Sequence, residues 1–215
     1  MTHQDSVNSG QWPTETEVLK QSATYRPVWW SNYCGDDVER LPGSPPDENG
    51  YASISRGDVL AMPKQTPGDL RQLLLAAYIW GTGKTAFRIR LRVRAFTKNG
   101  LSVEEFGARL HNAKELVRTD GPVRAYESML RRGNNNIRFC GPAFFTKFLY
   151  FSSFDPASTD PQPLILDRWV ARSLNMGRSP WSPQAYGEYL DLAVETSAGR
   201  RPDLFEYGHF MGRWD

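Results

Sequence analysis

A single acidic residue stands inside an apolar stretch in the last quarter of the chain. Asp167 follows Leu164-Ile-Leu166 and precedes residues with helical spacing, so it falls near the start of an expected helix over 164–175. A carboxylate in this position either caps the helix or serves as a reacting group held against the protein wall. The segment by itself favours the capping role.

A second segment, over residues 137–150, combines an apolar approach, a Gly-Pro pair and an amphipathic stretch. This order predicts a hairpin between helices, in which Pro142 occupies the first helical turn. The free backbone amides at such a helix start can hold a DNA phosphate. The predicted phosphate contacts are Gly141, Ala143, Lys147 and Arg138. An ordinary helix start explains the Gly-Pro pair equally well.

A third segment, Gly81-Thr-Gly-Lys-Thr85, has the composition of a phosphate loop but not its spacing. A Walker A loop needs a glycine five residues before the Gly-Lys pair, and Tyr78 stands there. The segment also follows an expected helix rather than a strand. We therefore exclude nucleotide hydrolysis and predict a Gly-rich turn between two helices.

Positive charge is concentrated in the middle of the chain, although the net charge is only +2. Residues 83–147 hold fourteen Lys and Arg against five Asp and Glu, and both flanking thirds are net acidic. A basic block of this size indicates a polyanionic partner, because neutralising phosphates releases counterions. A nucleic acid is the predicted partner. The alternative is a solvated helix face whose charges are balanced by the acidic segments.

Hydrophobic periodicity predicts a mainly α chain that positions these segments. Residues 87–94 alternate like an arginine-rich strand, but the chain offers no partner strand of similar quality, so we expect a helix over 85–97. Residues 1–67 hold seven of the fifteen prolines and show no sustained helical period. We expect an irregular N-terminal segment, 1–50, docked on a helical domain, 51–215. The first ten residues are expected to be loose. The other expected helices cover 67–80, 102–118, 121–132, 142–153, 182–197 and 202–212.

Composition excludes several classes of protein. Hydrophobic residues make up 40% and aromatic residues 13%, which excludes disorder for most of the chain. No apolar run is long enough for a membrane span and no secretory signal is visible, so the expected location is cytoplasmic. Cys34 and Cys140 are expected to be free thiols, and the scattered histidines predict no metal and no cofactor. No exposed heptad pattern is present, so we expect a monomer.

Three strings resemble the helix-hairpin-helix DNA glycosylases, and more narrowly a bacterial family with the 8-oxoguanine DNA glycosylase fold. They are Trp80-Gly-Thr-Gly83, Gly141-Pro-Ala-Phe-Phe-Thr-Lys147 and Leu164-Ile-Leu-Asp-Arg-Trp-Val-Ala-Arg172. The resemblance covers about residues 50–212 and extends to the bacteriophage-replication-inhibiting DNA glycosylases. It implies a helix-hairpin-helix glycosylase fold, with the hairpin at 137–150 and the Asp helix at 164–175, and double-stranded DNA with a modified base as the partner.

The resemblance also implies a role for Asp167 as the catalytic anion near C1′ of a flipped-out nucleotide. Bifunctional members of the superfamily carry a Schiff-base lysine two residues beyond the last small residue of the hairpin turn, where this chain has Phe145. Lys147 lies two positions further on, about 200° around a helix. We therefore expect it to point away and bind phosphate, and predict monofunctional hydrolysis that leaves an abasic site.

A flipped base needs a pocket and a side chain that fills the gap in the duplex. The candidates for these roles are Trp169, Trp181, Asn135 and Phe145. The aromatic ones are as a class more often part of a core than of a pocket.

The leading hypothesis is therefore a DNA glycosylase that excises glucosylated hydroxymethylcytosine from phage DNA as an anti-phage defence. One alternative is an 8-oxoguanine repair glycosylase, with lyase activity if Lys147 reaches the sugar. The other is a non-catalytic DNA-binding module in which Asp167 only caps its helix.

Overall fold

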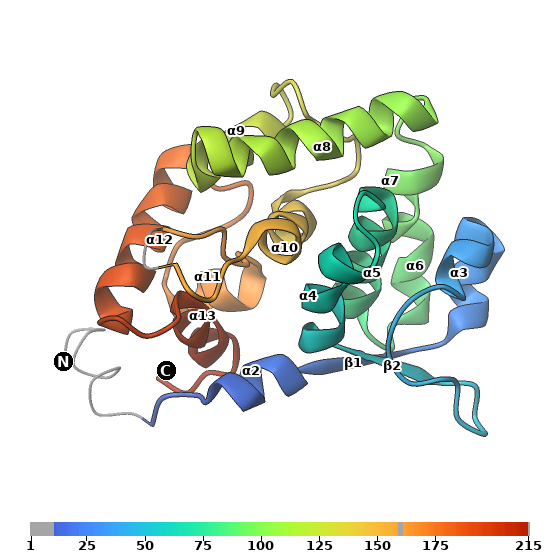
Figure 1. The fold of residues 1–215 in the computed structure, drawn as a ribbon, viewed down its shortest axis with the longest axis horizontal. Helices are drawn as coiled ribbons and strands as arrows, with labels where there is room; N and C mark the ends of the chain where they lie inside the picture. Colours follow the sequence, from blue (N-terminus) through green and yellow to red (C-terminus); the bar gives the residue numbers. More distant parts are fainter. Residues whose placement is uncertain (1–10, 159–160, 215) are drawn as a thin grey trace.

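The computed structural model describes residues 11–158 and 161–214, in which helices dominate (Figure 1). The mainly α prediction is confirmed; the first ten residues, expected to be loose, lie outside the described residues. None of the helices in the described ranges is long and apolar enough to cross a membrane. The helices after residue 66 are α5 (Leu70–Thr82), α6 (Ala86–Arg92), α7 (Arg94–Thr97), α8 (Val103–Thr119), α9 (Pro122–Met129), α10 (Pro142–Ser153), α11 (Arg168–Ser173), α12 (Pro183–Ser197) and α13 (Pro202–Phe210).

The N-terminal region is more regular than the proline content predicts. Its elements are α2 (Glu15–Lys20), β1 (Ser22–Tyr25), α3 (Pro27–Cys34), the 3-10 helix η1 (Gly35–Val38), β2 (Ala52–Ser55) and α4 (Arg56–Gln65). Capping boxes begin α2 at Thr14 and α4 at Ser55, which is why these short segments become helical. Strand β1 pairs antiparallel with β2, so the sheet joins the expected N-terminal segment to the rest of the chain.

The arginine-rich stretch is helical, as expected, and divides at Val93 into α6 and α7. Ile89 and Val93, four residues apart, are both 2% exposed and face the core, whereas the arginines surround the remaining surface. The helix α6 lies between α5 and α3 (Figure 1). The strand alternative for this stretch is wrong. A strand would place Leu91 on the same face as Ile89 and Val93, whereas Leu91 is 59% exposed.

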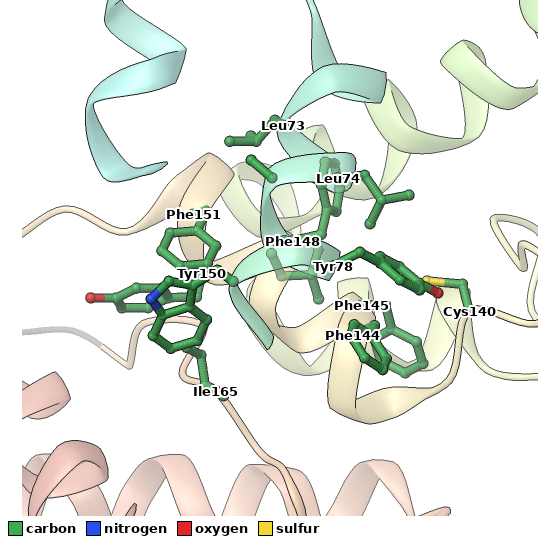
Figure 2. Packing of buried hydrophobic residues seen from close by; sticks show 14 of the residues in the cluster. Leu73, Leu74, Tyr78, Cys140, Phe144, Phe145, Phe148, Tyr150, Phe151 and Ile165 are labelled. Atoms are coloured by element: carbon green, nitrogen blue, oxygen red, sulfur yellow. The ribbon is translucent and has the colours of Figure 1, made fainter. Parts of the chain in front are cut away.

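The core is centred on the contact between α5 and α10. The rings of Tyr78 and Phe144 stack there with centroids 4.1 Å apart, and Figure 2 shows Phe148 and Leu74 packed nearby. Figure 2 also shows the Cys140 sulfur beside the Tyr78 hydroxyl. Cys140 and Cys34 are both buried and free, so the prediction of two free thiols is confirmed.

The helix expected over 164–175 is shorter in the structure and begins only at Arg168. Leu164, Ile165 and Leu166 are buried in a segment without regular secondary structure instead. Side-chain hydroxyls satisfy their backbone: Tyr186 donates to the Leu164 carbonyl at 2.9 Å, and Tyr189 donates to the Ile165 carbonyl at 2.9 Å. Because these bonds replace helical ones, the apolar triplet forms a wall that ends at Asp167.

Candidate active site

A buried ion pair joins α10 to the start of α11. The Lys147 Nζ donates to Asp167 Oδ2 at 3.1 Å and to the Ala143 carbonyl at 2.9 Å. The side chains of Lys147 and Asp167 are only 4% and 14% exposed. The expectation that Lys147 points away from Asp167 is therefore wrong. The non-helical segment before Asp167 brings its carboxylate beside the second turn of α10, a position that counting residues from the hairpin turn does not reveal.

The other oxygen of Asp167 caps α11. Its Oδ1 accepts from the backbone N–H of Trp169 at 2.9 Å and of Val170 at 3.4 Å. Burial acts to raise the pKa of Asp167, but the charge and hydrogen bond of Lys147, with the two backbone bonds, hold the pKa below its ordinary value. Asp167 is thus an ionised carboxylate with one oxygen facing an amine. The two roles that the sequence left as alternatives for it are geometrically compatible.

A cavity of about 530 Å³ opens onto this ion pair, and we call it the Lys147 cavity. Its walls come from the ends of α5 and α6, from α10 and α11, and from α13 near the C-terminus. Among the described residues, Asp167 is the one acidic residue that lines it. The aromatic lining residues include Trp80, Phe144 and Trp169, and the cationic ones, besides Lys147, are Arg88, Arg92 and Arg168. The cavity therefore combines flat apolar surfaces with donors for a polyanion.

Gly81 leaves room for the lysine side chain. A Cβ atom at Gly81 would lie 2.9 Å from Lys147 Cε and 3.3 Å from Phe144 Cε1. Two residues on, Gly83 ends α5 with a φ of 61°, which favours glycine. The Gly-rich segment is thus a turn between two helices, as expected, and its first glycine also borders the Lys147 stem.

The hairpin turn before α10 carries its cations on the surface. Gly141 is exposed and is the N-cap of α10, with no side-chain cap. The Arg138 guanidinium lies 4.7 Å from the centre of the Phe139 ring, and that of Arg94 lies 4.0 Å from the same ring. Gly141 and Arg138 are thus available for a phosphate. Ala143 lines the Lys147 cavity instead, and the buried Lys147 is not a surface contact.

One of the four candidates for pocket or wedge lies at the cavity. Trp169 lines the Lys147 cavity and is 47% exposed. Phe145, 1% exposed, packs against Tyr126, and Trp181, 5% exposed, belongs to the same core. Asn135, 5% exposed, donates to the Ser128 hydroxyl. The candidates Phe145, Trp181 and Asn135 do not line the Lys147 cavity. The first two pack in the core, and the third hydrogen-bonds to the Ser128 side chain.

The sequence reasoning missed several lining residues. Arg88 and Arg92 are four residues apart, so helical spacing could have placed them on one face of the arginine-rich helix. Trp80 stands in one of the strings that carry the family resemblance. Tyr207, Phe210 and Met211 come from α13, and only the tertiary structure brings them to Lys147.

Comparison with known protein families gives one match. A model described as "Putative 8-oxoguanine DNA glycosylase OGG-like protein" matches residues 16–210, which is most of the chain and includes Lys147, Asp167 and the lining helices. No curated protein and no solved structure matches the chain.

Proposed function

The chain belongs to the OGG-like family of putative 8-oxoguanine DNA glycosylases, and from this premise we propose that it excises a modified base from DNA with Lys147 and Asp167 as reacting groups. The observation that carries the proposal is the ion pair between these two residues on the wall of a basic, aromatic cavity. An accessible amine beside an ionised carboxylate is the pair that N-glycosidic cleavage with lyase activity requires.

Asp167 would act on the sugar. Cleavage of the N-glycosidic bond builds positive charge on the deoxyribose as the base departs, and a fixed carboxylate near C1′ stabilises that charge. The two backbone N–H groups on Oδ1 hold the carboxylate in place, so it need not reorganise during the reaction.

Lys147 would act on both the base and the sugar. Its ammonium group gives a proton to the departing base, which has taken the electron pair of the broken N-glycosidic bond. The freed amine then adds to C1′. A proton passes from Nζ to O4′ as the C1′–O4′ bond breaks, and an iminium link between Nζ and C1′ remains. Loss of a C2′ proton then expels the 3′ phosphate and breaks the strand. This proposal replaces the monofunctional mechanism, whose premise was a Lys147 directed away from Asp167.

The aromatic walls would receive the flipped base, and the exposed arginines would hold the backbone. Trp169 is half-exposed at the cavity, with the Arg168 guanidinium 4.6 Å from its ring centre. Phe144 lines the wall next to Lys147. The hairpin residues Gly141 and Arg138 would contact a neighbouring phosphate.

For the substrate, we propose glucosylated hydroxymethylcytosine in phage DNA, which gives the enzyme an anti-phage role. A cavity of about 530 Å³ is in the range that drug-sized ligands occupy, so a base that carries a sugar fits its size. Arg88, Arg92 and Arg168 supply donors for sugar hydroxyls. The second candidate is 8-oxoguanine, which the family description favours.

The test is incubation of the protein with three duplexes, containing glucosylated hydroxymethylcytosine, 8-oxoguanine or no modified base. Released bases are identified by mass spectrometry, and strand breaks are scored before and after alkali. Borohydride is added to trap any Schiff base as a covalent protein–DNA adduct. Release with trapping supports the proposal, whereas release with breaks only after alkali restores the monofunctional mechanism. Binding without release refutes the glycosylase and leaves a DNA-binding module.

Asp167→Asn separates catalysis from capping, because asparagine caps helices as well as aspartate does. The variant is expected to bind DNA with unchanged affinity and to lose base release. Asp69→Asn is the matched control, since Asp69 Oδ1 caps α5 by accepting from Gln72 N at 3.0 Å, away from the cavity. An Asp167→Asn variant with wild-type activity would remove Asp167 from the mechanism.

A further inference from the structure

The arginine-rich helix α6 presents two flanks with different surroundings. Arg88 and Arg92 line the Lys147 cavity. On another flank, Phe87 and Leu91 are 73% and 59% exposed, although both are large apolar side chains. They border a second hollow of about 750 Å³, between α3 and the α6–α7 pair, which we call the outer groove. Neither of these side chains is used by the proposed mechanism.

The outer groove is basic and aromatic. Its lining includes Tyr33, Phe87, Arg90, Leu91, Arg94 and Lys98. No Asp or Glu lines it among the described residues, and within the same residues its three cations form no ion pair. An apolar ridge beside unneutralised cations is unusual on a surface that faces only water.

A larger hollow, of about 820 Å³, lies elsewhere and has the opposite character. Glu115 and Glu127 line it, and they pair with Arg118 and Arg124 respectively. Its lining holds two acidic residues and two basic ones, Arg124 and Arg132. The outer groove, by contrast, has an excess of positive charge for a polyanion.

We propose that the outer groove binds a DNA strand whose bases are unstacked, with Phe87 and Tyr33 as stacking surfaces and Arg90, Arg94 and Lys98 on its phosphates. Proteins that hold single strands combine a cationic track with exposed aromatic rings in this way. Duplex DNA offers a strand in this state only where it is distorted. The proposal concerns DNA in the vicinity of the excised base and so rests on the proposed function.

Helix α6 and the hairpin turn relate the outer groove to the rest of the proposed DNA-binding surface. Helix α6 separates the two hollows, and a helix with side chains is about 10 Å wide, which a strand spans with roughly two nucleotides. Arg94 lines the groove and also lies over the Phe139 ring in the hairpin turn, at 4.0 Å. Arg94 of the groove and Arg138 of the predicted phosphate site therefore lie over the same ring.

The first experiment measures binding of a fluorescein-labelled single strand without any modified base, by fluorescence anisotropy. Phe87→Ala is expected to weaken binding about 5- to 100-fold, since stacking of one base contributes that much. Val103→Ala is the matched control, because Val103 is 74% exposed on α8 and lines none of the three hollows. Both positions are exposed, so melting temperatures are expected to match that of the wild type. Leu91→Ala provides a second variant of the ridge.

The second experiment varies the salt concentration. Arg90→Gln is expected to reduce the slope of log affinity against log salt by about 0.7, the value for one phosphate contact on a single strand. Lys64→Gln, at an exposed lysine on α4, is expected to leave the slope unchanged. Wild-type affinity in Phe87→Ala and Leu91→Ala, with an unchanged slope in Arg90→Gln, would overturn the proposal.

Base release assayed on the same variants keeps the two proposals apart. If Phe87→Ala loses single-strand binding and the wild type releases no base, the outer groove is supported and the glycosylase is refuted. Base release by the wild type with unaltered binding in all three variants would do the reverse. A tenfold preference of the wild type for RNA over DNA of the same sequence would also overturn the assignment of the groove to DNA.

Discussion

Two buried ion pairs lie close to the same indole ring, and they differ in access to solvent. Lys147 Nζ is 5.9 Å from the centre of the Trp80 ring and the Arg56 guanidinium is 5.4 Å from it. Lys147 pairs with Asp167 at an open cavity, whereas Arg56 pairs with Glu206 where the two side chains are 0% and 1% exposed. The comparison shows that access, and not burial of charge, distinguishes a candidate reacting pair from a structural one.

The Arg56 pair belongs to a network that ties three helices together. Arg56 begins α4, Glu206 and Asp203 lie in α13, and Tyr150 of α10 donates to Asp203 Oδ2 at 2.8 Å. Arg201 donates to the same Asp203 oxygen at 2.7 Å. Full burial raises the pKa of Glu206 to about 7, despite the opposing effect of Arg56. Such a network holds α13 against the core, and α13 in turn forms one wall of the Lys147 cavity.

The largest expected effect is on the rate of base release when the Lys147–Asp167 pair is broken, with little change in the free energy of unfolding. Lys147→Met is expected to lower base release by about 1,000-fold or more, because the ammonium group that protonates the departing base is gone. Stability should change by only about 1 kcal/mol, since Asp167 keeps its two backbone hydrogen bonds and some exposure. Single-turnover base release and urea unfolding measure the two effects. Lys64→Met controls for the loss of a lysine charge, and activity above a few per cent in Lys147→Met would contradict the prediction.

The enclosed pair should respond in the opposite way. Arg56→Met leaves the Glu206 carboxyl without its partner and is expected to destabilise the fold by about 3–5 kcal/mol. The double variant Arg56→Met with Glu206→Leu should recover much of that loss, because no buried charge then lacks a partner. Urea unfolding measures both variants. Below its melting temperature Arg56→Met should retain base release, and a specific loss of activity in folded protein would place Arg56 in the reaction instead.

The two pairs also predict opposite dependences of stability on pH. The raised pKa of Glu206 means that its contribution to stability is full below about 4.5 and is lost as the pH rises through about 7. The lowered pKa of Asp167 means that its contribution is present above 3.8 and is lost as the pH falls further. Between pH 5 and pH 8 the wild type should lose up to about 3 kcal/mol of unfolding free energy, at about 1.4 kcal/mol per pKa unit. Urea unfolding of Glu206→Gln should show a much smaller loss, and an equal loss in both proteins would exclude Glu206 as its source.

The smallest expected effect is on the reaction rate when the Lys147 amine is displaced slightly. Gly81→Ala places a methyl group against the Lys147 stem, and a shift of about 1 Å at a reacting group lowers rates by about 10- to 100-fold. DNA affinity and melting temperature should be close to those of the wild type. Gly107→Ala in α8 is the matched control, because its Cβ would meet nothing within 4 Å. Borohydride trapping that proceeds at the wild-type rate in Gly81→Ala would show that the lysine tolerates displacement.

Local sequence signals were sufficient for most of the helices and for the residue at the start of α11. The capping residue Ser102 and the Gly-Pro pair at 141–142 begin helices close to the predicted positions. The helices α2 and α4 were missed, although Thr14 and Ser55 each form a capping box. The many prolines of this region led to the prediction of an irregular segment. Two of them are compatible with helices, because Pro27 begins α3 and Pro63 lies within α4.

The sequence by itself determined the helical class, the hairpin before α10 and the exceptional carboxylate at Asp167, because caps, turns and periodicity depend on neighbours within about four residues. Only the tertiary structure decided that Lys147 meets that carboxylate and that α6 and α13 enclose them. The reason is the non-helical segment 164–166, held by hydroxyls of Tyr186 and Tyr189 some twenty residues away along the chain. Those long-range hydrogen bonds compete with the helix that local periodicity predicts, and their outcome sets the direction from which Asp167 approaches α10.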